Sequence, residues 1–384
     1  MHTSKAFVTG LGAFLPNDPV DNDAIDRVLG TVNQISGRVK QRVLLNNAIL
    51  NRHYAIDPET GKPTHTSAQL TCEAIRALAR NANFSLDDMD CLVCGTSSAD
   101  QIIPAHGSMV HAELGCRPCE VVTTMGVCCA GITAFKYGYL NVASGNSRNA
   151  VVTGSELASP SLTARHFQPE LDRERKEIGK EPMLAFENDF LRYMLSDGAG
   201  AMLIEPKPRD NGLSLHIDWL DILSFATETE VCMYFGLRKE KGNSIASYRH
   251  VSDPAELSKG RFLSLAQDVN VLRERIPALT HKALMATKRK RELVSERIDW
   301  FLPHYSSKWF RQPLYDLLID DGVPIPYEKW FTNLPSKGNT GSASIYIMLE
   351  ELARSGRLKS GQRLLCFIPE SARMTFAFLH LTAV

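Results

Sequence analysis

Short apolar runs alternate with amphipathic stretches along much of the chain, and glycine or proline often separates them. Residues Ala6–Phe14 predict a strand broken by glycine, and Asp23–Leu29 predicts a short helix. From Ser67 to Asn81, apolar residues recur roughly every three or four positions, which is the period of a helix with one buried face. Strands that alternate with helices indicate an α/β fold with a largely parallel sheet.

Further apolar runs in the first half predict buried strands, and the first of them ends in small polar residues. These runs are Asp90–Ser98, Val121–Met125 and Ala150–Glu156. A helix is predicted from Pro104 to about Leu114, and another over Ile132–Ser144. The alternation of strands and helices therefore continues through this half.

The second half repeats the order of the first with an offset of about 210 residues. The segment Asp299–Ser307 mirrors Asp90–Ser98, and Gly338–Ser344 begins a helix as Val127–Thr133 does. A register that holds over several landmarks indicates a duplicated α/β domain. The expected halves are residues 1–208 and residues 209–384.

Two cysteines stand at one of the strand-to-helix turns, in Gly126-Val127-Cys128-Cys129-Ala130-Gly131. The N-terminus of a helix favours negative charge, so a cysteine there is expected to have a lowered pKa and to be a better nucleophile. Cysteines are also ordinary buried apolar residues, and this turn alone does not separate the two interpretations. Register favours Cys129, which begins the helix, whereas Cys128 is expected to point into the packing.

The repeat brings further polar residues to the same place. Ligands of open α/β sheets bind beyond the carboxyl ends of the strands. Cys129 follows one such end, His304 lies at another, and Asn339 lies in the turn that matches that of Cys129. Taken alone, the histidine is an ordinary core residue and the asparagine an ordinary helix cap. Their joint placement opposite a thiol favours a catalytic cleft.

Composition and charge narrow the possible partners and location. Acidic and basic residues balance at 43 each, so no overall charge attracts nucleic acid or a membrane surface. The first residues contain no long apolar run after a basic start, so we expect no secretory signal, and no apolar run approaches the roughly 18 residues that span a bilayer. Nine cysteines without an export signal indicate reduced thiols and a cytoplasmic location.

The spacing of four cysteines superficially suggests a zinc site. Cys91 and Cys94 form one pair and Cys116 and Cys119 another, each with the separation of metal ligands. The first pair lies within a predicted strand, where positions three apart point to opposite faces of the sheet. Such a pair cannot hold one ion, so we expect no metal.

Four segments together resemble the signature of β-ketoacyl-ACP synthase III, a family of the thiolase superfamily. They are Cys129–Gly131, Ser196–Ala201, Pro303–His304 and Gly338–Ser344. The resemblance extends from about Phe7 to the C-terminus. It implies a five-layered α-β-α-β-α fold, a homodimer, acyl carrier protein as a partner and no bound cofactor. It also implies that Cys129, His304 and Asn339 are the catalytic residues.

Some positions depart from that family. Members that use coenzyme A usually carry an arginine where this chain has Trp309, and another nucleotide-contacting arginine falls near Asn46. Both losses favour carrier-protein substrates. The family's glycine triplet is replaced by Pro369-Glu370-Ser371, so we expect Ser371 to supply the second oxyanion-hole N–H beside that of Cys129.

Two further features bear on the substrates. The Pro369–Ser371 ending, together with His304–Ser307, resembles an atypical branch that includes ketosynthases of dialkylresorcinol and cyclohexanedione biosynthesis. Ile103 falls where that family's dimer partner pushes an aromatic residue into the acyl pocket. An isoleucine would leave room for a longer or branched chain, although it is equally an ordinary interface residue.

Basic residues near the predicted cleft are candidates for contact with an acidic carrier protein. Lys308 and Arg311 come just after His304 and are expected at its mouth. The more basic run Lys288–Arg291 ends a helix that runs antiparallel to the His304 strand. We therefore expect this run at the far end of the sheet, as a solvated helix C-terminus that complements the helix dipole.

The expected reaction is a Claisen-type condensation in fatty-acid-like, polyketide-like or dialkylresorcinol-like biosynthesis. An acyl group on Cys129 would combine with a malonyl or β-ketoacyl carrier thioester, which becomes an enolate by losing CO2 or a proton. Two alternatives remain: an acyltransferase that acts on a hydroxyl or amine, and a non-catalytic subunit that pairs with an active homologue. The complete set of Cys129, His304 and Asn339 disfavours the second alternative.

Overall fold

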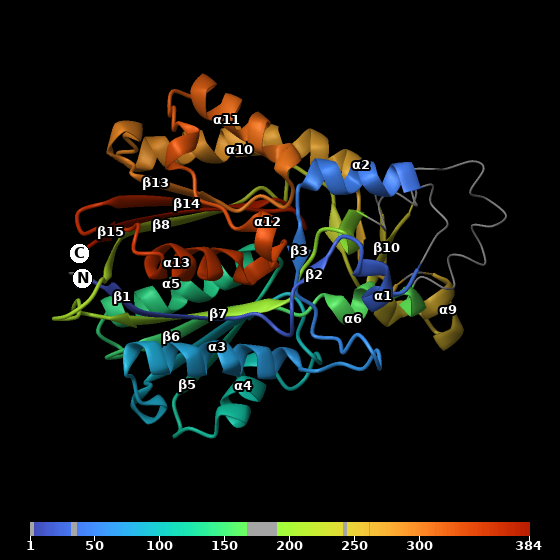
Figure 1. Cartoon of the computed structure of the whole chain (residues 1–384), viewed down its shortest axis with the longest axis horizontal. Helices are drawn as coiled ribbons and strands as arrows, with labels where there is room; N and C mark the ends of the chain where they lie inside the picture. The colour runs from blue at the N-terminus through green and yellow to red at the C-terminus, as the bar shows by residue number, and fades with distance from the viewer. Residues whose placement is uncertain (1–3, 32–36, 167–189, 241–243, 261) are drawn as a thin grey trace.

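The structure is a computed structural model of the chain. It describes residues 4–31, 37–166, 190–240, 244–260 and 262–384. Figure 1 shows five layers, in which two layers of sheet alternate with three layers of helix. The five-layered α-β-α-β-α fold expected from the sequence is confirmed.

The two layers of sheet are halves of one hydrogen-bonded sheet, joined where β1 pairs with β8. The first half consists of β1 (Phe7–Phe14), β7 (Gly198–Glu205), β6 (Ala150–Glu156), β4 (Cys91–Thr96) and β5 (Glu120–Met125). The second half consists of β8 (Leu215–Ser224), β15 (Thr375–Ala383), β14 (Arg363–Glu370) and β13 (Trp300–Pro303).

The same order of pairing recurs in both half-sheets. In the first half, β6 is parallel to β4 and antiparallel to β7. In the second, β14 is parallel to β13 and antiparallel to β15. The duplication is therefore confirmed, but the expectation of a largely parallel sheet is wrong. Strands β7 and β15 return antiparallel, and β15 does so because a tight turn after Glu370 makes a hairpin with β14.

Helices form the other three layers (Figure 1). The outer helices on the first half-sheet are α3 (Ser67–Ala82) and α4 (His106–Leu114), and those on the second are α10 (Val269–Lys290) and α11 (Arg311–Asp320). The central layer contains α5 (Cys129–Ala143) and α13 (Ser344–Arg354).

The remaining helices and strands are short or lie outside these layers. They are α1 (Ile25–Leu29), α2 (Gly37–Asn47), α6 (Ser159–Leu162), α9 (Pro254–Lys259), α12 (Leu334–Lys337), β2 (Val20–Asp21), β3 (Asn51–Arg52), β9 (Met233–Tyr234), β10 (Leu237–Lys239), β11 (Ile245–Ser247) and β12 (Ala266–Gln267).

Helix α3 shows how local sequence sets an element. The hydroxyl of Thr66 accepts from Gln69 N at 3.2 Å, and Gln69 Oε1 accepts from Thr66 N at 3.0 Å, which is a capping box. Leu70, Ile75 and Leu78 are fully buried on one face, as the periodicity predicts. The predicted helix over Ser67–Asn81 is thus confirmed to within a residue at its C-terminus.

Two glycines allow the backbones of the central layer to pack closely against each other. A Cβ on Gly131 of α5 or on Gly154 of β6 would overlap the carbonyl oxygen of Ser342. The hydroxyl of Tyr346 donates to the carbonyl oxygen of Gly131 at 2.8 Å. These contacts hold the N-terminal turn of α5 against the segment that precedes α13, so the two turns singled out by the repeat are neighbours.

Cys91 and Cys94 pack into different hydrophobic clusters, on opposite faces of β4. The sequence argument that this pair cannot bind one ion therefore agrees with the geometry of the strand. Within the described ranges, no helix has both the length and the apolar character that a membrane span requires.

Candidate active site

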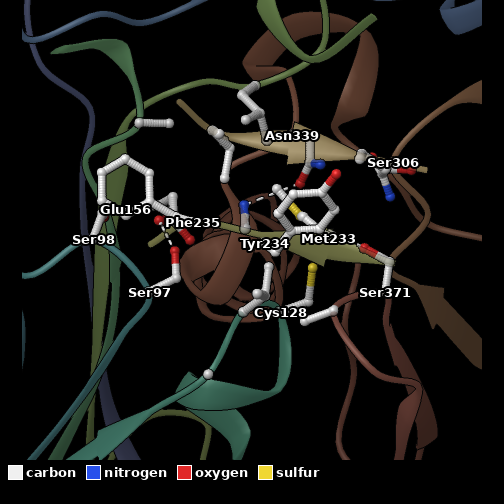
Figure 2. A pocket seen from close by; sticks show the side chains of 18 of the residues that line it. Ser97, Ser98, Cys128, Glu156, Met233, Tyr234, Phe235, Ser306, Asn339 and Ser371 are labelled. Atoms are coloured by element: carbon white, nitrogen blue, oxygen red, sulfur yellow. Dashed lines mark hydrogen bonds between the residues drawn. The ribbon is translucent and has the colours of Figure 1, made fainter. Parts of the chain in front are cut away.

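A cavity of about 900 Å3 lies where the carboxyl ends of β4, β6 and β13 meet the N-terminus of α5. This volume is near the upper end of the roughly 300–1,000 Å3 of small-molecule sites, which leaves room for an acyl chain and a second reactant. Its polar lining includes Ser97, Ser98, Glu156, His304, Ser306, Asn339 and Ser371. Figure 2 labels all of these except His304. Apolar side chains of α10 and α11 also line it, including Leu272, Ile276, Leu314 and Leu317.

His304 follows the last residue of β13 and lines the cavity. Its backbone N–H donates to the carbonyl oxygen of Phe367 at 2.8 Å, which continues the pairing of β13 with β14. Burial lowers the pKa of the imidazole to about 4. At neutral pH the ring is therefore uncharged, with one N–H that can donate a hydrogen bond.

Asn339 is held in the cavity wall by its backbone. Its N–H donates to the carbonyl oxygen of Met194 at 3.0 Å, and its carbonyl oxygen accepts from Ser196 N at 2.9 Å. Its side-chain Oδ1 accepts from Gly341 N at 3.0 Å. Because Oδ1 is engaged in this turn, the group that Asn339 offers to a ligand is its amide N–H2. The structure thus brings His304 and Asn339 to one cavity.

The two adjacent thiols are placed differently. Cys128 lines the cavity, whereas Cys129 is not among the lining residues. The Cys129 Sγ lies 3.4 Å from the carbonyl oxygen of Ile368 and 3.7 Å from that of Thr375. The expectation that Cys128 points only into the packing is therefore wrong: its side chain packs in a hydrophobic cluster and also lines the cavity. The nucleophilic role of Cys129 stays a prediction.

The pKa of each thiol also differs from the expected direction. Burial raises the pKa of Cys129 well above its usual value, and the nearby Glu370 carboxyl and Cys128 add to the rise. Burial and Glu370 raise the pKa of Cys128 in the same way. The position at the N-terminus of α5 favours a thiolate, but the loss of water around both sulfurs outweighs it. The resting site therefore holds neutral thiols.

Ser371 lies in the turn between β14 and β15 and lines the cavity. Oε1 of Glu370 accepts from the backbone N–H of Ala372 at 3.0 Å and of Arg373 at 3.4 Å, which fixes this turn. The hydroxyl of Ser371 lies 3.8 Å from Sδ of Met233. Its backbone N–H as an oxyanion donor remains a prediction.

The other predicted substrate contacts lie outside the cavity lining. Lys308 and Trp309 are exposed, and the Arg311 guanidinium stacks at 4.0 Å over the ring of Tyr327. Ile103 is 83% exposed, although its neighbour Ile102 does line the cavity. Their roles toward a carrier protein or an acyl chain are not decided by this arrangement and stay predictions.

The basic run at the end of α10 is more engaged than expected. Lys290 and Arg291 both bind the buried carboxylate of Asp221, at 2.5 and 2.9 Å. The Lys288 Nζ donates to the carbonyl oxygen of Asp321 at 2.6 Å. The run is exposed at Arg289 and Lys290, as predicted, and lines no part of the cavity. The ion pairs with Asp221 of β8 were not predicted.

Several residues that line the cavity were not predicted from the sequence. Glu156 is one, although it ends a predicted strand and the rule of strand ends would have found it. The segment from Val231 to Leu237 and the residues Leu263, Leu265 and Gln267 are others. They carry no motif, and contacts between distant segments, among them the pairing of β9 with β12, bring them together at the cavity.

We expect Gly341→Ala to disable the site while the rest of the fold persists. Gly341 has φ of +51°, and an added Cβ would overlap the carboxylate of Glu156. Both effects displace the turn whose N–H fixes the Asn339 side chain. We expect the free energy of unfolding to fall by about 1–3 kcal/mol. We expect activity to fall further than the smaller folded fraction would explain. Denaturant unfolding measured beside turnover tests this. Gly361→Ala is the control for backbone strain alone, because Gly361 also has a positive φ but an added Cβ there would meet no other atom.

Comparisons with known proteins agree on one family. The model for the 3-oxoacyl-[acyl-carrier-protein (ACP)] synthase III C terminal matches residues 289–367. A β-ketoacyl-[acyl-carrier-protein] synthase III from Rhodopirellula baltica is 26% identical, with 93% of each chain covered. One from Clostridium perfringens is 23% identical, with 94% of each chain covered.

Solved structures share the fold over nearly the whole chain. AbyA1, a tetronic acid condensing enzyme, has a TM-score of 0.76 at 18% identity and covers 98% of this chain and 99% of its own. Xanthomonas campestris OleA with bound lauric acid and lauroyl-CoA has a TM-score of 0.73 at 17% identity and covers 100% of both chains. FabH from Pseudomonas aeruginosa has a TM-score of 0.70 at 18% identity, with 98% of each chain covered.

Proposed function

We propose, on the premise that this chain belongs to the β-ketoacyl-ACP synthase III-like condensing enzymes, that it joins two acyl thioesters by a Claisen-type condensation. The observation that carries the proposal is one cavity lined by a neutral imidazole and an amide N–H2 beside two thiols at a helix N-terminus. A neutral donor pair suits a carbonyl oxygen that gains negative charge.

The first half-reaction loads the enzyme. The Cys129 sulfur attacks, as the thiolate, the carbonyl carbon of an acyl thioester. The bond from that carbon to the carrier sulfur breaks, and the proton lost by Cys129 ends on the carrier sulfur, so that the carrier departs as a thiol. The backbone N–H of Cys129, with that of Ser371, would hold the oxyanion of the tetrahedral intermediate. Because burial raises the pKa of this thiol, the thiolate forms only transiently and loading should accelerate as pH rises above neutral.

The second half-reaction makes the carbon–carbon bond. His304 and the Asn339 amide donate hydrogen bonds to the thioester carbonyl oxygen of the second substrate. An enolate forms there and attacks the acyl carbon on Cys129. The bond from that carbon to sulfur breaks, and Cys129 is released as the thiolate. The size of the cavity allows both chains to be present at once.

Intact-mass measurement after mixing with acyl-carrier thioesters tests the proposal. An added acyl mass on Cys129, located by peptide mapping, supports the first step, and a β-keto product formed with a second thioester supports the second. Transfer of the acyl group to a hydroxyl or amine without a new carbon–carbon bond would favour an acyltransferase. No acyl adduct at all would favour a non-catalytic subunit.

We further propose a homodimer in which each chain contributes two halves, residues 1–208 and 209–384. The first half supplies Cys129 and the second supplies His304 and Asn339. Strand β5 is at the edge of the sheet, and Met125 at its end and Ile103 are exposed apolar residues. An apolar sheet edge favours a protein partner. Light scattering of the purified protein would give the mass, and a monomer at micromolar concentration would contradict the proposal.

We expect acyl-carrier thioesters to load the enzyme far better than the same chains on coenzyme A. Trp309 and Asn46 offer no cation to the nucleotide phosphates, so the CoA moiety adds little binding. Lys308→Glu with Arg311→Glu should weaken carrier binding by roughly tenfold, because rim charges act mainly on association. Arg289→Glu is the matched control, since Arg289 is exposed on the last turn of α10. Binding measured at two salt concentrations tests this, and equal loading from CoA thioesters would refute it.

A further inference from the structure

Glu156 is a buried carboxyl in the cavity that the mechanism above does not use. It is the last residue of β6, its side chain lines the cavity, and the residue is 4% exposed. The Ser97 hydroxyl donates to its Oε1, and Ser342 N donates to its Oε2 at 3.3 Å. These donors, together with the Ser98 side chain, fix the carboxyl, whose oxygens can each accept more than one hydrogen bond. Figure 2 shows Glu156 and Ser97 on one side of the cavity.

The turn that contains Asn339 also contacts Glu156. Gly341 N fixes Oδ1 of Asn339, and the next residue, Ser342, donates to Glu156. The carboxylate lies so close to Gly341 that a Cβ there would overlap it. Glu156 and Asn339 are thus held by adjacent residues of one turn and line the same cavity. A thioester whose carbonyl oxygen binds the Asn339 amide has its α-carbon one bond from the carbonyl carbon, in the space that Glu156 also lines.

The charges around the cavity favour a substrate without its own carboxylate. Asp100 and Glu156 are among its lining residues, and among the lining residues that the structure describes Arg373 is the one lysine or arginine. Nε of Arg373 donates to the carbonyl oxygen of Ala226 at 3.1 Å. A malonyl group would bring a further negative charge beside Glu156, where two carboxylates repel each other.

We propose that Glu156 is the base that removes a proton from the α-carbon of the second thioester, so that condensation starts by proton loss and not by decarboxylation. This inference rests on the proposed function and names its substrate class, a β-ketoacyl thioester. The C–H bond breaks and its electron pair becomes the enolate held by His304 and Asn339. The proton goes to Glu156. After the carbon–carbon bond forms, this proton neutralises the departing Cys129 thiolate and restores both groups.

Burial and the neighbouring Asp197 raise the pKa of the Glu156 carboxyl, which brings its basicity closer to what a proton abstraction needs. The donors from Ser97, Ser98 and Ser342 oppose this rise. Asp197 and the Cys128 thiol are the titratable groups whose charges interact with it. The base should act above its pKa, so condensation is expected to fall as pH falls through that value.

Glu156→Gln tests the inference, because it keeps the size of the side chain and removes only the base. We expect Cys129 to be acylated as in the wild type, and condensation with a 3-oxodecanoyl carrier thioester to fall by roughly 100-fold or more. Condensation with a malonyl carrier thioester, where the wild type supports it, should be retained, since loss of CO2 needs no base. Glu205→Gln is the matched control: Glu205 ends the neighbouring strand β7, binds Thr9 and lines no part of the cavity.

The pH dependence separates a base from a residue that only holds the turn. With the 3-oxodecanoyl carrier thioester, the wild type and Glu156→Asp should show a decline of kcat at acid pH, and Glu156→Gln should lack this decline. Equal losses with both donors and an unchanged pH profile would make Glu156 a positioning residue for Asn339 and overturn the inference. Wild-type use of malonyl alone would also overturn it. Missing acylation in the wild type would instead contradict the proposed function itself.

Discussion

Replacing Cys129 with serine is expected to abolish acyl loading, whereas Cys128→Ser should retain it. Cys129 begins α5 and Cys128 precedes it, and we expect the backbone N–H of Cys129 to stabilise the oxyanion. A serine hydroxyl at the same place is a far weaker nucleophile, because it ionises much less readily than a thiol. We expect a loss of roughly three orders of magnitude or more.

The structure makes this comparison stringent, because Cys128 and not Cys129 lines the cavity. Both thiols are buried and both have raised pKa values, so exposure and acidity do not separate them. The measurement is the intact mass of each variant after incubation with an acyl-carrier thioester, followed by peptide mapping. Loading that survives in Cys129→Ser and disappears in Cys128→Ser would reverse the assignment.

His304→Ala is expected to leave loading of Cys129 largely intact and to slow carbon–carbon bond formation by roughly two to three orders of magnitude. The charge that develops in the second half-reaction sits on the oxygen of an enolate. His304 and Asn339 both line the cavity with donors for that oxygen. Loading develops its charge elsewhere, at the backbone of Cys129, and so needs little from the imidazole.

The same experiment has an internal control in Asn339→Ala, which should behave alike. The double variant should lose less than the product of the single losses, because both groups act on one oxygen. Since the pKa of His304 is about 4, its protonation should not produce a decline of activity near neutral pH. A single-turnover assay that follows acyl-enzyme and product separately tests these outcomes. If His304→Ala blocks acyl-enzyme formation instead, the imidazole is the base for the thiol.

Local sequence patterns predict much of the fold. The runs that became β4, β6 and β14 are short, apolar and bounded by turns, and α3 has a capping box and a helical period. The offset between the halves then placed Asn339 in the turn equivalent to that of Cys129. Because strand ends in equivalent positions face one another, sequence was enough to bring His304 and Asn339 to one cavity.

What the sequence could not determine depends on contacts between distant segments. The pKa of Cys129 is raised because residues around Ile368 and Thr375 exclude water from the sulfur, and no pattern near the thiol records them. Helix position alone predicted the opposite direction. The direction of a thiol pKa follows from burial and neighbouring charge, and both are properties of the assembled layers.

The outline of the cavity is likewise a tertiary property. Its wall includes α10, α11 and the paired strands β9 and β12, which lack any motif and come together only through packing. Which of the two adjacent cysteines lines the cavity depends on the tertiary structure around the start of α5. The sequence places both residues at the same turn and does not distinguish them in this respect. The sequence by itself determined which chemical groups lie at the strand ends, because the order of the strands and the offset between the two halves fix their positions. The tertiary structure alone decided which side chains touch the substrate space and in which protonation state, because both depend on the water that distant segments exclude.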